Sequence, residues 1–309
     1  MSKRVRTFLR PVVGLALLFL VAVSGDVGGV AAAQNVLTGE WTASVDSENS
    51  GKLHLTLERR TEKGGRSRMG TDYDFADLQG LSREQVARGG AVKFSLVREA
   101  GAVECEGSFR DGRGSGTFRF TGNQSFVSAM KGRGFDFETD APAARDGRDV
   151  ENRLFAATTL NVTTALADDL LTADLGKLDV EDLFKAAIFK VDSKFAREMK
   201  ASGFADLGLE ELVKARIFKI DAAFVGEVAR MGFAKEPMES LVQMRIFKVT
   251  PEFIAETRNE GLGDLPLEDL VKLRVFKIDG EFIRRAKADG VPLEVERLVQ
   301  RRIGVRSRF

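Results

Sequence analysis

The chain has 309 residues, of which 47 are lysine or arginine and 46 are aspartate or glutamate, so its formal net charge is only +1. This balance argues against a general binder of nucleic acids or other polyanions, because such proteins concentrate positive charge. One histidine and one cysteine exclude an internal disulfide and a zinc site made of several such ligands.

The first 33 residues have the pattern of a secretory signal peptide. Four basic residues precede an apolar run at 11–23, and small residues at 31–33 offer a cleavage site before Gln34. The run is shorter than the roughly 20 residues of a membrane-spanning helix, so we predict cleavage after residue 33 and no stable membrane anchor. Cleavage would leave 43 basic and 45 acidic residues. We predict an exported protein, periplasmic or secreted, and the lack of disulfides favours a bacterial envelope.

Residues 34–137 are predicted to form a strand-rich domain. Apolar and polar residues alternate at 52–58, 92–96 and 103–110, so each run is expected to bury one face. Further strands are expected at Trp41–Val45 and Thr117–Phe120, with a short helix at Ser82–Arg88. The result is an antiparallel β meander of about six strands. Such a sheet either closes into a small barrel or covers its apolar face with a helix.

The tripeptide Gly39-Glu40-Trp41 resembles the Gly-x-Trp that begins the first strand of lipocalin-like barrels. The plainer interpretation is that Trp41 is a core aromatic residue. A barrel that binds a small apolar ligand would need an enclosed cavity near Trp41, Phe94 and Phe118. A solid core at this place would exclude that function.

A helix at 126–135 is predicted to close the strand-rich domain. Five of its residues share the spacing of five residues in a later repeat: Phe126, Met130, Lys131, Gly134 and Phe135 correspond to Phe195, Met199, Lys200, Gly203 and Phe204. We expect this helix to cap the repeats. A polar linker, 138–149, follows it, and we expect the two domains to be joined rigidly.

Residues 150–309 repeat with a step of 29 residues. The tripeptide Ile188-Phe189-Lys190 returns twice at this step and a third time as Val275-Phe276-Lys277, and leucines, phenylalanines and glycines keep the step as well. Each unit is predicted to contain two short helices, the second of which begins after a capping residue and ends at a glycine. Such helix pairs cannot bury their apolar faces alone, so the units are expected to stack into an α-solenoid. The predicted fold class is α+β.

Within one unit, the first helix is predicted at Leu209–Phe218. Four apolar side chains are expected on its buried side: Leu209, Leu212, Val213 and Ile217. The second helix is expected to begin after Asp221 and to bury Phe224, Val228 and Met231.

A strand-rich module followed by such repeats resembles a family of bacterial exported proteins often associated with BlaR1-type antirepressor peptidases. The segments that carry the resemblance are Gly107–Phe109, Gly114–Phe120, Phe126–Phe135, and Leu212–Phe224 with its copies. The resemblance implies this architecture, an extracytoplasmic location and at most a role beside a sensor or peptidase. The chain has no His-Glu-x-x-His motif, so it is not itself such a peptidase.

The residue inventory predicts no catalytic residues, metal site or cofactor. Alternation places Cys105 on the buried face of its strand and His54 on the polar face, so we predict a structural thiol and a solvated imidazole. Glu104 and Glu106 lie two apart on an exposed face, where nothing should raise a carboxyl pKa. A carboxylate-based hydrolase is the enzymatic alternative.

Two basic rows recur in the repeats and form the candidate binding surface. Its members are Lys190, Arg216, Lys219, Arg245, Lys248, Arg274, Lys277 and Arg302. The structural explanation is that cations suit the C-terminal end of a helix, and recurring glutamates could pair with them: Glu181, Glu210, Glu239 and Glu268. The functional explanation is a grip on a protein partner, an anionic envelope polymer or lipid head groups.

We therefore predict an extracytoplasmic, non-enzymatic interaction protein whose repeats dock a protein partner in the cell envelope. One alternative is a β-barrel that binds a small apolar ligand and uses the repeats for docking. Another is an accessory component of a BlaR1-type sensor and peptidase system. Nucleic acid is not an expected partner.

Overall fold

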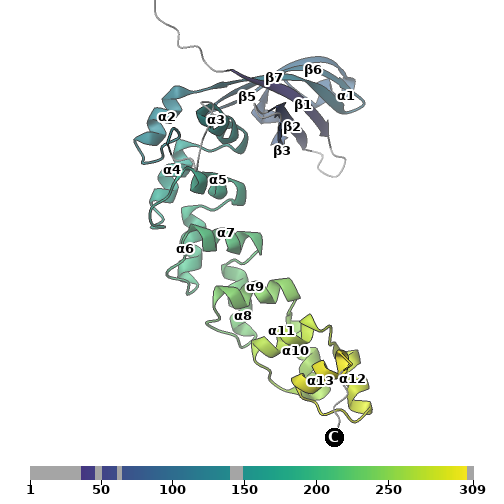
Figure 1. Cartoon of the computed structure of the whole chain (residues 1–309). Helices are drawn as coiled ribbons and strands as arrows, with labels where there is room; N and C mark the ends of the chain where they lie inside the picture. The colour runs from purple at the N-terminus through teal and green to yellow at the C-terminus, as the bar shows by residue number, and fades with distance from the viewer. Residues whose placement is uncertain (1–35, 46–50, 61–64, 140–148, 305–309) are drawn as a thin grey trace, which may run out of the picture. The chain divides into compact units, whose positions relative to one another are not determined.

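The computed structural model describes residues 36–45, 51–60, 65–139 and 149–304. An antiparallel sheet is followed by a series of helices (Figure 1), so the predicted α+β class is confirmed. The predicted signal peptide and most of the predicted linker lie outside the described residues. Within these ranges, no helix combines the length and the apolar character that crossing a membrane requires.

The sheet has seven strands in the described part of the chain. They are β1 (Leu37–Val45), β2 (Lys52–Arg60), β3 (Arg66–Asp74), β4 (Leu78–Gln79), β5 (Gly90–Arg98), β6 (Gly101–Arg110) and β7 (Arg113–Gly122). Their order is β3-β2-β1-β7-β6-β5-β4, and every neighbouring pair is antiparallel. The predicted antiparallel meander or small barrel is therefore confirmed, with seven strands in the described residues where about six were expected. Two meanders, β1 to β3 and β4 to β7, join where β1 pairs with β7, and the sheet curls into a half barrel.

Aromatic rings fill the apolar side of the sheet. Trp41 is 1% exposed, its ring meets Phe94 edge-on with centroids 5.2 Å apart, and its Nε1 donates to the Glu106 carbonyl at 3.1 Å. Phe118 stacks on Phe155 of helix α3 (Asp149–Leu160), with centroids 5.5 Å apart. The rings occupy the space where an enclosed ligand cavity would have to lie, and α3 covers the apolar face.

The short helix beside the sheet is α1 (Arg83–Arg88), as the sequence predicts. The Ser82 hydroxyl accepts from the Gln85 backbone N–H, and the Gln85 side chain accepts from the Ser82 backbone N–H. This reciprocal capping box satisfies two N–H groups that a helix start leaves without partners. A single 3₁₀ turn, Phe75–Asp77, links β3 to β4.

The remaining helices form two rows (Figure 1). The first helices of the units are α3, α5 (Val180–Phe189), α7 (Leu209–Ile217), α9 (Met238–Phe247), α11 (Leu267–Val275) and α13 (Val295–Arg302). The second helices are α2 (Gln124–Lys131), α4 (Thr164–Leu171), α6 (Ser193–Ala201), α8 (Ala222–Arg230), α10 (Pro251–Thr257) and α12 (Gly280–Ala288). Consecutive first helices contact one another from α3 to α13. The α2 helix contacts α4, as a cap on the second row would.

Local signals place the second helices. Their capping residues accept a hydrogen bond from the backbone N–H three residues later: Thr163, Asp192, Asp221, Thr250 and Asp279. The glycines after these helices have positive φ: Gly203 (106°), Gly232 (103°), Gly261 (102°) and Gly290 (75°). Glycine suits such a left-handed position because it has no Cβ. Both predicted end signals are confirmed.

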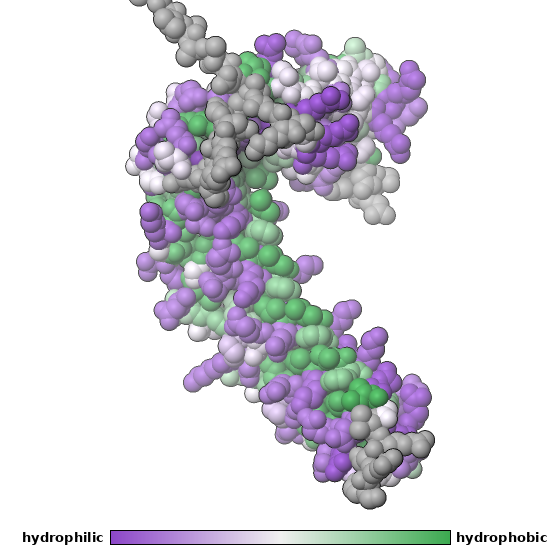
Figure 2. Space-filling model, in the orientation of Figure 1, coloured by the Kyte–Doolittle hydropathy of each residue, from purple (hydrophilic) through white to green (hydrophobic). Residues whose placement is uncertain are grey.

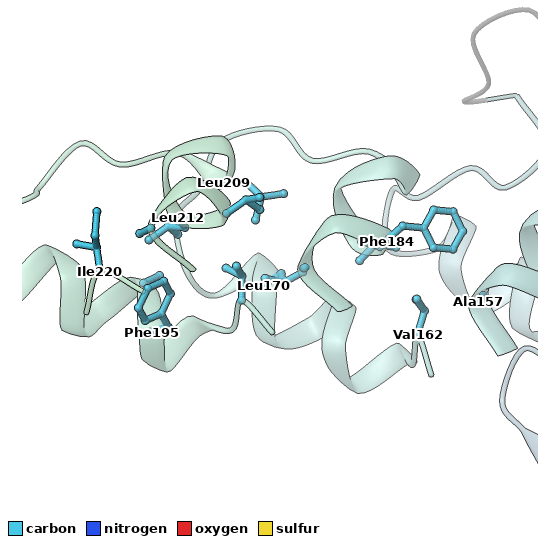
Figure 3. Close-up of a cluster of buried hydrophobic side chains, with 14 of the residues drawn as sticks. Ala157, Val162, Leu170, Phe184, Phe195, Leu209, Leu212 and Ile220 are labelled. Atoms are coloured by element: carbon cyan, nitrogen blue, oxygen red, sulfur yellow. The ribbon is translucent and has the colours of Figure 1, made fainter. Parts of the chain in front are cut away.

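The repeated phenylalanines form the core of the stack. Phe195, Phe224 and Phe253 are 2%, 6% and 5% exposed. Figure 3 shows Phe195 lying near Leu212 and Ile220 of the following unit. Each unit therefore completes its apolar core with its neighbour, as the repeat pattern predicts.

One predicted core position was wrong. Ile217 was expected on the buried side of its helix, but it is 51% exposed. At about 100° per residue, Arg216 falls between Leu209 and Leu212 on the helical wheel, and Ile217 falls outside this arc. Arg216 therefore takes the inward position that the apolar pattern assigned to Ile217.

Candidate docking surface of the repeats

The four arginines of the candidate surface lie over phenylalanine rings of the preceding unit. The guanidinium carbon is 3.7 Å from the ring centroid for Arg216 over Phe195, 3.6 Å for Arg245 over Phe224, 4.8 Å for Arg274 over Phe253 and 5.2 Å for Arg302 over Phe282. All four distances are within the range of a cation–π interaction. This contact links each unit to the one before it.

Three of these arginines also donate to the preceding first helix. Arg245 Nη2 lies 2.8 Å from the Lys219 carbonyl, Arg274 Nε lies 2.8 Å from the Phe247 carbonyl, and Arg302 Nε lies 3.0 Å from the Phe276 carbonyl. Carbonyls at the end of a helix have no partner within it. These arginines donate hydrogen bonds to such carbonyls and cover the phenylalanine core. The four arginines, half of the candidate surface, therefore already have partners inside the array.

Two of the four recurring glutamates, Glu210 and Glu239, pair with lysines outside the candidate surface, as does Glu296 of the last unit. Glu210 pairs with Lys185, Glu239 with Lys214 at 3.2 Å, and Glu296 with Lys272 at 2.6 Å. Each pair joins consecutive first helices. The hydrogen bond to Glu296 raises the pKa of Lys272, and the bond to Glu210 raises that of Lys185.

The four lysines of the candidate surface behave differently, and we call them the lysine row. They are Lys190, Lys219, Lys248 and Lys277, all exposed at the ends of first helices. Their φ angles are 55°, 54°, 53° and 52°, in the left-handed region. Within the described residues their side chains form no hydrogen bond or ion pair.

Beside the lysine row lies a row of exposed aliphatic side chains, which we call the isoleucine row. Its members are Ile188, Ile217, Ile246 and Val275, which are 51%, 51%, 51% and 47% exposed. Each precedes its lysine by two residues. On the face shown in Figure 2, hydrophobic residues form a band along the helical region.

In the first unit, strand β3 covers the position equivalent to the isoleucine row. Thr159 stands one step before Ile188 and is only 3% exposed. Its carbonyl accepts from the Tyr73 hydroxyl at 3.0 Å, and its hydroxyl lies 3.5 Å from Met69 Sδ, so strand β3 lies against it. The position that is open in later units is a protein contact in the first.

Shallow grooves recur between consecutive first helices. One, of about 300 Å³, is lined by Ile246, Phe247, Lys248, Arg274, Lys277, Ile278 and Asp279. A second groove of the same volume is lined by Leu160, Asn161, Leu166, Ala186, Ala187, Lys190, Val191 and Asp192. Six lining positions of the second correspond to the first after three steps of 29 residues. The same groove therefore occurs at two interfaces, α3–α5 and α9–α11.

The sheet domain contains one arrangement that the sequence did not indicate. His54 Nδ1 lies 2.7 Å from Asp72 Oδ1 on the neighbouring strand, and the Thr56 hydroxyl lies 3.4 Å from Nε2. Asp72 lies on β3, opposite His54 on β2. The sequence did not predict β3, because its residues are largely polar. The imidazole is exposed, as predicted.

The other candidate reactive groups lie where the sequence predicted. Cys105 is 1% exposed, and burial raises the pKa of its thiol to about 12. Glu106 is exposed and pairs with Lys93 at 2.6 Å, and the hydrogen bond from that lysine lowers its carboxyl pKa. A catalytic acid would need the opposite shift. In the part of the chain that the structure describes, no group of three or more histidine, cysteine, aspartate or glutamate residues could hold a metal ion.

Comparison with known proteins gave no match to a family model, a curated protein or a solved structure.

Proposed function

We propose that this protein is an exported, non-enzymatic interaction protein whose helical repeats dock a protein partner in the cell envelope. The isoleucine row is the observation that carries the proposal. A single exposed aliphatic side chain is ordinary on a protein surface. Four at the same place in successive units line up along the stacked helices, and aligned apolar side chains are typical of a docking surface.

The two alternatives have unequal support. The packing of Trp41 against Phe94, and of Phe118 against Phe155, gives no support to a small-ligand barrel. The resemblance to exported proteins associated with BlaR1-type peptidases favours a partner within such a sensor and peptidase system. That role is a narrower form of the same proposal.

Capture of the partner tests the proposal. The variant I188S/I217S/I246S/V275S is expected to lose a protein that the parent captures from envelope extracts of the source cells, because the substitutions remove the aliphatic side chains. The matched control V97S/L171S alters exposed aliphatic residues outside the row, 47% and 50% exposed, and should retain it. Equal capture by all three proteins, with unchanged circular dichroism, would count against the proposal.

Export has its own test. The full chain expressed in a bacterial host is expected in the periplasm or medium, with an N-terminus that begins at Gln34. An intact N-terminus in the cytoplasmic fraction would contradict this part of the proposal.

A further inference from the structure

Among the described residues of the array, 149–304, three sets of cations recur, and one of them has no partner within these residues. The arginines stack on phenylalanine rings and bond to helix-end carbonyls. Lys185, Lys214 and Lys272 pair with glutamates of the next unit. The lysine row is exposed, and its side chains have no hydrogen bond or ion pair with any residue in the described ranges. Stacking of the units therefore does not explain why these positions are lysine.

The backbone conformation of the lysine row also points to a role outside the array. A left-handed φ is unfavourable for a residue with a Cβ, and glycine occupies such a position at the end of each later second helix, as at Gly232 and Gly261. At the end of the first helices the chain places lysine instead, at Lys219 and Lys248. A cation near a helix C-terminus is favourable, but the side chain remains free to bind something outside the array.

The lysine accompanies the open aliphatic position. In the first unit the equivalent positions are Thr159, which β3 covers, and Asn161, which also has a left-handed φ of 56°. In the four units from Ile188 to Val275 the aliphatic position is open and the left-handed residue is a lysine, whereas at the open Ile303 of the last unit the left-handed residue is Gly304. The covered unit thus has neither the aliphatic side chain nor the charge.

The grooves define the chemistry of the occupant. The groove at Ile246 has three cations in its lining, Lys248, Arg274 and Lys277, and one acid, Asp279. The Asp279 carboxylate caps α12 by accepting from the Phe282 N–H at 2.9 Å and keeps its charge, so three cations against one acid leave the lining positive. The groove is positive with an aliphatic edge, which suits a segment that carries both carboxylates and aliphatic side chains.

We infer that the isoleucine and lysine rows form one track, which binds an extended acidic segment of a partner protein with an aliphatic residue at about every third position. The inference rests on the proposed function. Packed helices lie about 8–10 Å apart, and three residues of an extended chain span about 10 Å. The spacing of the row therefore matches an extended chain with one aliphatic side chain per unit.

A synthetic peptide tests the track directly. Fluorescein-labelled peptide with four consecutive Glu-Leu-Asp units, about 40 Å long when extended, is titrated with the full chain and followed by anisotropy. We expect saturable binding that weakens as salt is added, because exposed charges are screened. The same peptide with lysine in place of every acid should not bind. Equal binding of the basic peptide would overturn the inference.

Substitutions of the lysine row separate binding from folding. The variant K190G/K219G/K248G/K277G places glycine at four left-handed φ positions, where glycine has no Cβ to strain, so we expect a higher Tm. It also removes four charges, so we expect peptide binding to weaken about tenfold or more. The variant K190R/K219R/K248R/K277R keeps both the charge and the backbone demand, and should keep the affinity. The control K177Q/K194Q/R230Q/K287Q removes four exposed charges elsewhere, and should bind within about twofold of the parent.

Three outcomes would overturn the track: unchanged affinity of the glycine variant, equal loss in the control, or no binding of the acidic peptide. If the peptide fails while the aliphatic variant still loses its partner, the proposed function stands and only the track is wrong. Light scattering tests whether a second copy of the chain occupies the isoleucine row instead. A dimer that the I188S/I217S/I246S/V275S variant abolishes would show that it does.

Discussion

The sheet domain and the repeat array solve the burial of apolar residues in opposite ways. In the sheet, pairing of distant segments brings aromatic rings together, and among its described residues the only large aliphatic side chains exposed are Val36 and Val97. In the array, each unit buries its phenylalanine against its neighbour and still exposes one aliphatic residue per step. The difference indicates that the sheet is built for a closed core, whereas the array is built to leave one surface open.

The two regions also differ in how much room their backbones leave. A Cβ added at Gly116 in β7 would lie 2.0 Å from the Glu106 carbonyl oxygen, whereas one added at Gly226 in α8 would have no atom within 4 Å. Strand pairing fixes the first position from both sides, and the outer surface of a helix leaves the second free.

The largest effect is expected for one alanine placed in each region. Gly116→Ala should destabilise the protein by more than about 4 kcal/mol or prevent folding, because a backbone oxygen cannot move away cheaply. Gly226→Ala should instead stabilise it by about 0.5–1 kcal/mol, since alanine is the better helix former. Urea unfolding followed by circular dichroism measures both. Similar destabilisation by the two alanines would break the comparison.

A large but local effect is expected at Phe224. Phe224→Ala should cost about 3–5 kcal/mol, because it leaves a cavity and removes the ring beneath Arg245. In a stack of units the loss should remain near α7 to α9. Hydrogen exchange should therefore rise there while the strands keep their protection. The same substitution at Phe282, which is only partly buried, is the matched control and should cost less. Uniform loss of protection would show that the regions unfold together.

The features of the two regions that depend on residues close together in the chain could be predicted from the sequence. The 29-residue step, the caps at Asp192 and Asp221 and the closing glycines act over a few residues, and the structure has them where expected. The pairing of β1 with β7 joins segments about 75 residues apart and leaves no local pattern. β3 was missed because an edge strand with polar residues lacks apolar alternation.

The candidate site was predictable only in part, for a related reason. Periodicity found the lysines and arginines but could not tell which had partners, because those partners lie in the next unit. The inward position of Arg216 and the outward position of Ile217 depend on the stacking of units, which places a ring of the preceding unit beneath the guanidinium.

A moderate effect is expected at the junction of the two regions. Burial raises the pKa of Tyr73 from 10.0 to about 12, and its hydroxyl donates to the Thr159 carbonyl at 3.0 Å. Because the folded state keeps the phenol neutral, the stability it contributes is present below pH 10 and is lost as the pH rises towards 12. Between pH 9 and pH 11 the free energy of unfolding of the parent should fall by about 1 kcal/mol more than that of Tyr73→Phe. The buried thiol of Cys105 is present in both proteins, so its titration cancels in this difference. Parallel loss in both proteins would place the phenol outside the buried junction.

The smallest effect tests whether the array is the sum of its unit interfaces. Lysine–glutamate pairs join α5 to α7, α7 to α9 and α11 to α13, but at the interface of α9 and α11 the lysine position is Gln243 and the glutamate is Glu268. Gln243→Lys should therefore complete the series and stabilise the protein by about 0.5 kcal/mol or less, since such exposed pairs are weak.

The control for this last change is Gln243→Glu, which places two like charges at the same interface and should destabilise by a similar amount. Thermal unfolding at low and high salt measures both, because screening should shrink the two effects together. If Gln243→Lys stabilised the protein equally at high salt, the gain would come from the helix propensity of lysine within α9. The pairs would then contribute nothing to stacking, and the phenylalanine core with its arginine cover would hold the units together alone.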